Sequence, residues 1–98
     1  MEADKEEKRI ITKLIGHAGF DRERYMFVMK CLADSRKDRT RIGRRKISEL
    51  AHEKELFLSE NEIRGILNVL KKYGLVSLSN GRGGTQLTTL GARVYDGM

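Results

Sequence analysis

The chain has 98 residues, 39% hydrophobic and 35% charged, which is typical of one small globular domain with a heavily charged surface. Its apolar stretches are far shorter than the roughly 20 residues that a membrane span needs, and its acidic start, MEADKEEKR, lacks the pattern of a signal peptide. The single cysteine excludes an internal disulfide and favours a cytoplasmic setting. The 20 Lys and Arg residues against 14 Asp and Glu give a net charge of +6, which makes nucleic acid the leading candidate partner.

The first predicted helix spans residues 5–18, where apolar side chains recur at helical spacing on one face: Ile10, Ile11, Leu14, Ile15 and Ala18. Two uses of this face stay open, because it either covers the core or pairs two protomers in a homodimer. A second helix is predicted over 21–34, with Asp21 as its N-cap. This helix is apolar on nearly all sides in its middle, so we expect it to be the most buried element.

The basic run 36–43 shows no apolar periodicity and contains Gly43, which indicates a loop. Its cations are candidates for phosphate contacts, and disorder in the absence of DNA is the alternative. The third predicted helix spans 44–55 and turns Ile47, Leu50 and Ala51 toward the core. The segment LFLS, residues 56–59, breaks that pattern and turns the chain.

The fourth predicted helix, residues 59–73, has the clearest signals in the sequence. Ser59 and Glu62 have the spacing of a capping box, in which each side chain accepts a hydrogen bond from the backbone amide of the other residue. Four apolar residues then recur at i, i+3, i+4 and i+7, namely Ile63, Ile66, Leu67 and Leu70. Gly74 stands where a left-handed residue is expected to end the helix.

The remaining residues predict a β-hairpin over 75–88 and a last helix over 90–96. The strands are Leu75–Leu78 and Thr85–Thr88, and the segment SNGRGG between them supplies the positive φ values of a hairpin tip. Thr88 or Thr89 is the expected cap of the last helix. Because that helix looks cut short, one hypothesis is that the chain is one domain of a longer protein that carries an effector domain.

This order of elements resembles the winged helix-turn-helix family. The likeness is carried by KISELAHEKELFLSENEIRGILNVLKKYGLV and LSNGRGGTQLTTLG, which together cover residues 46–91. The phrase ILNVLKKYGLV is similar to the end of the recognition helix in many bacterial and archaeal regulators. QLTTLGARVYD is similar to the residues after the wing in several of those.

The resemblance implies a mainly α fold with a small β-hairpin, in which 21–34, 44–55 and 59–73 are helices 1, 2 and 3. Helix 3 is then the recognition helix, 75–88 is the wing, and 5–18 is an additional N-terminal helix. The implied function is sequence-specific binding of double-stranded DNA by a transcriptional regulator, with the recognition helix in the major groove and the wing on the flanking groove. The alternatives are an RNA-binding or nuclease-associated winged helix and a protein-interaction module.

The charges are grouped in a way that fits an anionic partner. Residues 36–46 carry seven basic side chains and one acidic one, and residues 64–82 carry four basic side chains and no acidic one. Between these two basic zones, residues 47–63 carry five acidic side chains against one lysine. A solvated surface is the ordinary alternative for each run.

The candidate DNA-binding residues come from both basic zones and from the recognition helix. Arginine can bind guanine O6 and N7 and asparagine can bind adenine N6 and N7, so Asn61, Arg64 and Asn68 form a possible base-reading row. Gly65 either lets the helix backbone approach a groove wall or packs against helix 2. The complete predicted set is Arg41, Arg44, Arg45, Lys46, Ser59, Asn61, Arg64, Gly65, Asn68, Lys71 and Arg82.

Catalytic and metal chemistry find no support in the sequence. The two histidines, His17 and His52, are far apart, and with Cys31 they fall short of the about four ligands of a zinc site. The segment NGRGG is too short for a phosphate-binding P-loop and is not followed by Lys and Ser or Thr. We therefore expect no enzymatic activity, no metal and no cofactor.

Overall fold

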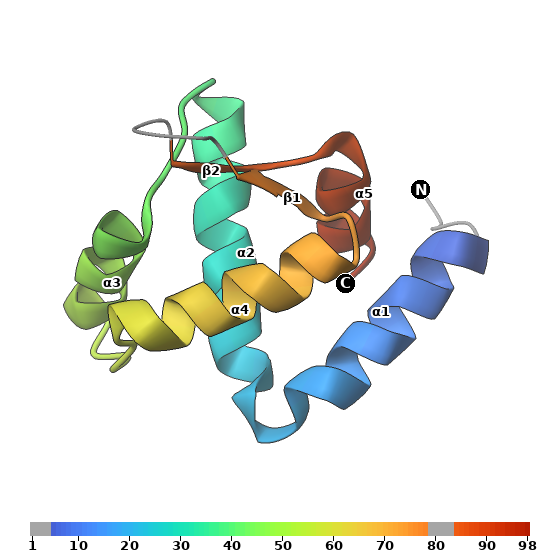
Figure 1. Cartoon of the computed structure of the whole chain (residues 1–98), viewed down its shortest axis with the longest axis horizontal. Coiled ribbons are helices and arrows are strands. Elements are labelled where there is room, and N and C mark those ends of the chain that lie inside the picture. The colour runs from blue at the N-terminus through green and yellow to red at the C-terminus, as the bar shows by residue number, and fades with distance from the viewer. Residues whose placement is uncertain (1–4, 79–83) are drawn as a thin grey trace.

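The computed structural model describes residues 5–78 and 84–98 (Figure 1). The elements are α1 (Lys5–Ala18), a short 3-10 turn (Gly19–Asp21), α2 (Arg22–Lys37), α3 (Arg44–Glu53), α4 (Glu60–Lys72), β1 (Val76–Leu78), β2 (Thr85–Leu87) and α5 (Thr89–Gly97). The protein is therefore mainly helical with a small antiparallel hairpin, which confirms the coarse fold class. Within the described residues, no helix has the length and apolar character needed to cross a membrane.

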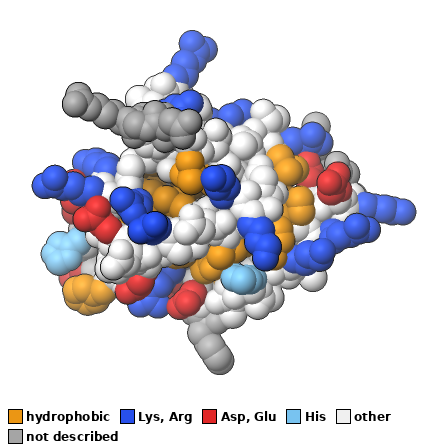
Figure 2. Space-filling model, in the orientation of Figure 1, with side chains coloured by type: hydrophobic (Ala, Val, Ile, Leu, Met, Phe, Trp, Pro, Cys, Tyr) orange, Lys and Arg blue, Asp and Glu red, His pale blue; other side chains and the backbone are white. Residues whose placement is uncertain are grey.

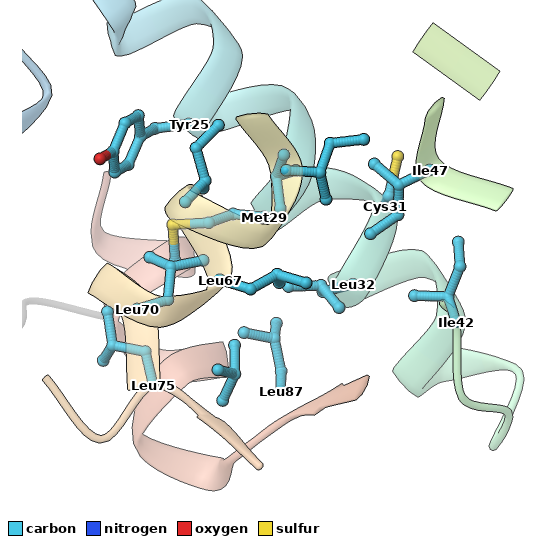
Figure 3. Packing of buried hydrophobic residues seen from close by; sticks show 14 of the residues in the cluster. Tyr25, Met29, Cys31, Leu32, Ile42, Ile47, Leu67, Leu70, Leu75 and Leu87 are labelled. Atoms are coloured by element: carbon cyan, nitrogen blue, oxygen red, sulfur yellow. The ribbon is translucent and has the colours of Figure 1, made fainter. Parts of the chain in front are cut away.

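Helix α2 runs through the middle of the molecule, and α4 crosses it (Figure 1). Met29 and Leu32 of α2 are fully buried and lie in one cluster with Leu67 and Leu70 of α4 (Figure 3). Burying such side chains stabilises a fold by about 1.5–3 kcal/mol each. The prediction that α2 is strongly buried is confirmed, because it contributes more buried residues than any other described element.

The hairpin closes one end of this core and is joined there by the segment before α3. Val76 pairs with Leu87 and Leu78 with Thr85 in antiparallel register. Thr85 also forms a bridge with Ile42, in which the two residues exchange backbone hydrogen bonds of 3.1 and 2.8 Å. The basic loop is therefore tied to β2 by an apolar residue that the sequence pattern does not single out.

At the ends of α2, the predicted N-cap residue is confirmed in position, whereas the predicted end is wrong. Asp21 directly precedes α2 as its N-cap but makes no capping hydrogen bond; it lies in the 3-10 turn, where its carboxylate is 3.3 Å from the Arg24 guanidinium. At the other end, α2 continues to Lys37 rather than stopping at residue 34. Arg36 is consequently helical, and its guanidinium donates a hydrogen bond of 3.2 Å to the Leu87 carbonyl. Arg36 thus holds the hairpin against α2.

Helices α2, α3 and α4 all end in the same hydrogen-bonded pattern, the Schellman motif. Each has a left-handed residue after its cap, with φ of 56° at Arg39, 59° at Glu55 and 75° at Gly74. After α3, for example, the amides of Glu55 and Leu56 donate to the carbonyls of His52 and Ala51. This pattern ends α3 at Glu53, two residues before the predicted end at residue 55.

The predicted capping box of α4 is half formed. The Ser59 hydroxyl accepts a hydrogen bond of 3.1 Å from the Glu62 amide, as expected. The Glu62 carboxylate, however, does not return to the Ser59 amide; it lies 3.7 Å from the Arg24 guanidinium of α2. Thr88 caps α5 by accepting from the Gly91 amide at 3.0 Å, and α5 begins at Thr89, one residue earlier than predicted.

Helix α1 packs mainly on α5 and also contacts α2. Leu14 and Ala18 of its apolar stripe are buried within the chain itself. The buried Glu7 carboxylate lies 2.7 Å from Arg93 of α5. These contacts match the alternative in which the stripe covers the core, and the structure gives no support for a homodimer through this helix.

Replacing Glu55 with glycine tests the end of α3. A left-handed conformation costs a residue with a side chain about 1–2 kcal/mol, while glycine avoids this cost but loses more entropy on folding. We expect Glu55→Gly to increase the free energy of unfolding by about 0.5–1 kcal/mol in urea denaturation. The reciprocal control, Gly74→Ala, should decrease it by a similar amount, and a destabilised Glu55→Gly variant would contradict the left-handed assignment.

Candidate nucleic-acid interface

The start of α3, the outer side of α4 and the hairpin surround a hollow of about 370 Å³, which we call the main hollow. Figure 2 shows this face of the molecule, with basic side chains over α4 and hydrophobic side chains between them and the hairpin. The residues that line the main hollow are Gly43, Arg44, Arg64, Leu67, Asn68, Leu78, Gly84 and Thr85. Three of the predicted site residues, Arg44, Arg64 and Asn68, are thus brought to one place.

The start of α3 carries the positive end of the helix dipole, and no described side chain caps its backbone amides. Its N-cap, Gly43, is extended at φ −98° and ψ 170° and offers no side chain to the first backbone amides. The first turn contains no acidic residue, and Arg44, Arg45 and Lys46 are all exposed. Unpaired amides at the start of a helix attract anions. A phosphate group at this point would meet both the helix dipole and three cations.

The loop that leads into α3 is held at fixed points on the rest of the chain. At its beginning, the Ser35 hydroxyl donates a hydrogen bond of 2.7 Å to the Thr40 carbonyl. At its end, Gly84 of the hairpin has φ +73°, and a Cβ atom there would lie 3.0 Å from the carbonyl carbon and oxygen of Ile42. The backbones of residues 42 and 84 are therefore so close that glycine is the residue best suited to position 84. The start of α3 is therefore positioned by the hairpin.

The two faces of α4 are divided as the apolar spacing predicted. Ile63, Ile66, Leu67 and Leu70 are buried, which confirms the predicted core face. The opposite face is exposed and carries Asn61, Arg64, Gly65, Asn68, Lys71 and Lys72. The candidate base-reading row therefore lies on the solvent side of the helix, next to the main hollow.

The surroundings of Gly65 contradict one of its two predicted roles, close packing against the preceding helix. A Cβ atom built at this position would meet nothing within 4 Å, so the glycine is not needed for packing against α3 or any other described element. Glycine in a helix interior costs about 1 kcal/mol relative to alanine. The internal-packing alternative is therefore wrong.

The cations of the main hollow have no acidic partner among the described residues, whereas the acidic side chains of this face lie to one side. Among residues 5–78 and 84–98, Arg44 and Arg64 make no ion pair. Arg45 is 3.5 Å from Glu49, but its side chain is 86% exposed, so this pair is weak. Figure 2 shows acidic side chains around the end of α3 and the start of α4. The basic and acidic parts of this face are thus separated.

The other predicted site residues that the structure describes do not line the main hollow. Arg41 is exposed in the loop just before Ile42, and Ser59 lines a separate hollow with Phe57 and His52. Arg82 lies outside the described residues. Sequence reasoning missed the contribution of the hairpin strands, where Leu78 is 39% exposed at the main hollow. Only the strand register, which sets which side chains point outward, could have identified it.

Cys31 does not line the main hollow, and its thiol is poorly reactive. Its side chain is buried, and burial, followed by the charge of Asp34, raises the thiol pKa to about 11. At neutral pH the thiol is therefore protonated and a weak nucleophile. Within the described residues, no group of three or more His, Cys, Asp or Glu side chains is placed to hold a metal ion.

Comparison of the chain with family models, with curated proteins and with solved structures finds no match. A function for this chain is therefore inferred from the arrangement of its own residues. The main elements of that arrangement are an uncapped basic helix start, an exposed polar helix face and an antiparallel hairpin around one hollow.

The buried thiol gives a direct test of the core. A rise of the Cys31 pKa from 9.0 to about 11 lowers the thiolate fraction near neutral pH by about 100-fold. Because a thiolate of higher pKa is also more nucleophilic, which offsets part of this factor, we expect iodoacetamide to alkylate the folded protein at pH 8 at least about 10-fold more slowly than it alkylates the urea-unfolded protein. Mass spectrometry at timed intervals measures both rates. Equal rates in the two states would show that Cys31 is accessible.

Proposed function

We propose that this chain is a winged helix-turn-helix domain that binds double-stranded DNA in a sequence-specific manner, as part of a transcriptional regulator. In this proposal α2, α3 and α4 are helices 1, 2 and 3, the β1–β2 hairpin belongs to the wing, and α1 is additional. The order of these elements along the chain and the hairpin directly after α4 support the assignment.

One observation carries the proposal. Arg44 belongs to the first basic zone of the sequence and Arg64 to the second, with an acidic stretch between them, yet both line the main hollow. If these cations only kept the surface solvated, Arg44 and Arg64 would have no reason to lie at one hollow without an acidic side chain between them. An anionic ligand supplies the missing partner charge.

The proposed division of work follows from the positions of the side chains. The uncapped start of α3, with Arg44, Arg45 and Lys46, binds phosphate groups and so fixes the register of the protein on the duplex. Arg64, on the exposed face of α4, reaches into the major groove and binds guanine O6 and N7. Arg41 and Lys71 add phosphate contacts at the edges. Arg82, outside the described residues, stays a prediction for the flanking groove.

A protein-interaction module is the second candidate, and one observation favours it. Phe57 is 74% exposed in the turn between α3 and α4 and makes an edge contact with His52, with ring centroids 6.2 Å apart. An exposed aromatic side chain is a common anchor at protein interfaces. This surface lines a different hollow from the main hollow, although Ser59 of the predicted DNA-binding set also lies there.

Salt dependence tests the electrostatic basis of the proposal. If about five basic side chains meet phosphates, the logarithm of the binding constant should fall against the logarithm of salt concentration with a slope of about −4 to −5. Fluorescence anisotropy with a random-sequence duplex at several salt concentrations measures this slope. Absence of duplex binding at low salt would remove the proposed function, and stronger binding to A-form RNA would favour the RNA-binding alternative.

Single substitutions separate base reading from phosphate binding. Arg64→Ala should lose about 1–3 kcal/mol on the preferred duplex and lower discrimination at one base pair, because a bidentate contact to guanine is removed. Arg45→Ala should weaken all duplexes by similar factors and reduce the salt slope by about one.

The matched control for both variants is Lys30→Ala, which removes one exposed positive charge on α2 beside Cys31. This variant should bind duplexes almost as the unchanged protein does. Equal weakening of preferred and random duplexes by Arg64→Ala would make Arg64 a phosphate contact and the protein a general nucleic-acid binder.

A further inference from the structure

The middle of the exposed face of α4 carries unusually short side chains. Asn61, Gly65 and Asn68 follow one another at i, i+4 and i+7, so they form one line along the helix. The longer cations Arg64 and Lys71 lie to one side of this line, and Lys72, four residues after Asn68, continues it at the end of the helix. A ligand that met only the long side chains could bind at a distance from the helix, whereas contact with the short ones requires a close approach.

Gly65 makes such an approach possible. It lies in the interior of α4, is exposed, and has only open space where a Cβ atom would stand. No turn, positive φ or close packing within the described residues calls for glycine at this position. An atom of a ligand can therefore touch the helix backbone here, at a position where a side chain would hold it away.

The two asparagines beside Gly65 have free amide groups. In residues 5–78 and 84–98 neither the Asn61 nor the Asn68 side chain takes part in a hydrogen bond. The carboxamide of asparagine accepts from adenine N6 and donates to adenine N7 in the major groove. Its reach is shorter than that of arginine by several bonds, so this contact needs the helix close to the groove floor.

Building on the proposed function, we propose that Gly65 lets the backbone of α4 approach the floor of the major groove, so that Asn61 and Asn68 each bind an adenine. The spacing of the two bases follows from helix geometry. Seven residues of α-helix span about 10 Å at about 1.5 Å per residue. Base pairs in a duplex are about 3.4 Å apart along the axis. A helix inclined to the duplex axis covers less than this length along it, so the preferred duplex contains two A·T pairs at most about three base pairs apart.

The test uses a matched pair of glycine substitutions. Gly65→Ala adds one methyl group to the exposed face of α4, and Gly16→Ala adds one to α1, where a Cβ atom also meets nothing within 4 Å. Alanine is the better helix former, so each variant should unfold at a midpoint temperature about 2–8 °C higher. A defect of Gly65→Ala in binding then cannot come from a damaged fold.

Affinities are measured by fluorescence anisotropy on the duplex selected from a random library by the unchanged protein. Gly65→Ala should bind this duplex about tenfold more weakly, because the asparagine contacts lengthen, and Gly16→Ala should bind it as the unchanged protein does. Discrimination at the guanine read by Arg64 should persist in Gly65→Ala, since the longer side chain still reaches its base.

Duplexes with 7-deazaadenine at the two preferred positions complete the experiment, because this base lacks the N7 acceptor. The modified duplex should bind the unchanged protein several-fold more weakly, while Gly65→Ala should bind modified and unmodified duplexes equally. A selected site without two spaced A·T pairs, or equal binding of the unmodified duplex by Gly65→Ala and Gly16→Ala, would overturn the inference and leave the proposed function standing. If the unchanged protein binds no duplex, the proposed function itself fails.

Discussion

The crossing of α4 over α2 is the packing on which the rest of the arrangement depends. Four side chains of α4 are buried on one side of that helix, and Leu70 and Ile63 are fully excluded from solvent. Once this side is fixed against α2, helical geometry leaves no freedom in the direction of the outer row. The same apolar contacts that stabilise the core therefore aim Asn61, Arg64 and Asn68 at solvent.

A second constraint brings α3 to the same place. The two-residue bridge between Ile42 and Thr85 joins a loop at the middle of the chain to a strand near its end. Because Arg44 follows Ile42 by only two residues, this bridge places the start of α3 beside the hairpin and the outer side of α4. This contact thereby brings the cations at the start of α3 close to Arg64 on α4.

The parts of the fold that depend on local patterns were predictable from the sequence. Apolar periodicity placed the buried face of α4, and the glycine at position 74 predicted how that helix ends. The parts that depend on distant partners were not predictable. Ile42 is a lone apolar residue in a basic run, and its role exists only because Thr85 lies opposite it. Likewise, Arg36 belongs by its neighbours to a charged loop, but its partner is the distant Leu87 carbonyl.

In the candidate site, too, features set by local sequence patterns were predictable, and features set by distant partners were not. The exposed row of α4 follows from helical phase alone, so its members could be named in advance. The meeting of Arg44 with Arg64 could be named only through resemblance, because no local rule connects them. Helix ends were least predictable, since Arg39 and Glu55 take left-handed conformations that residues with side chains rarely adopt.

The pairing of α1 with α5 has a consequence for the order of folding. Contacts such as that between Glu7 and Arg93 close almost the whole chain into one loop, and the entropy of loop closure grows with loop length. Contacts between α3 and α4 close much shorter loops. We therefore expect the central helices to assemble before α1 docks, and α1 to detach first when the protein opens. Its amides should then exchange hydrogen faster than those of α4, while the main hollow stays formed.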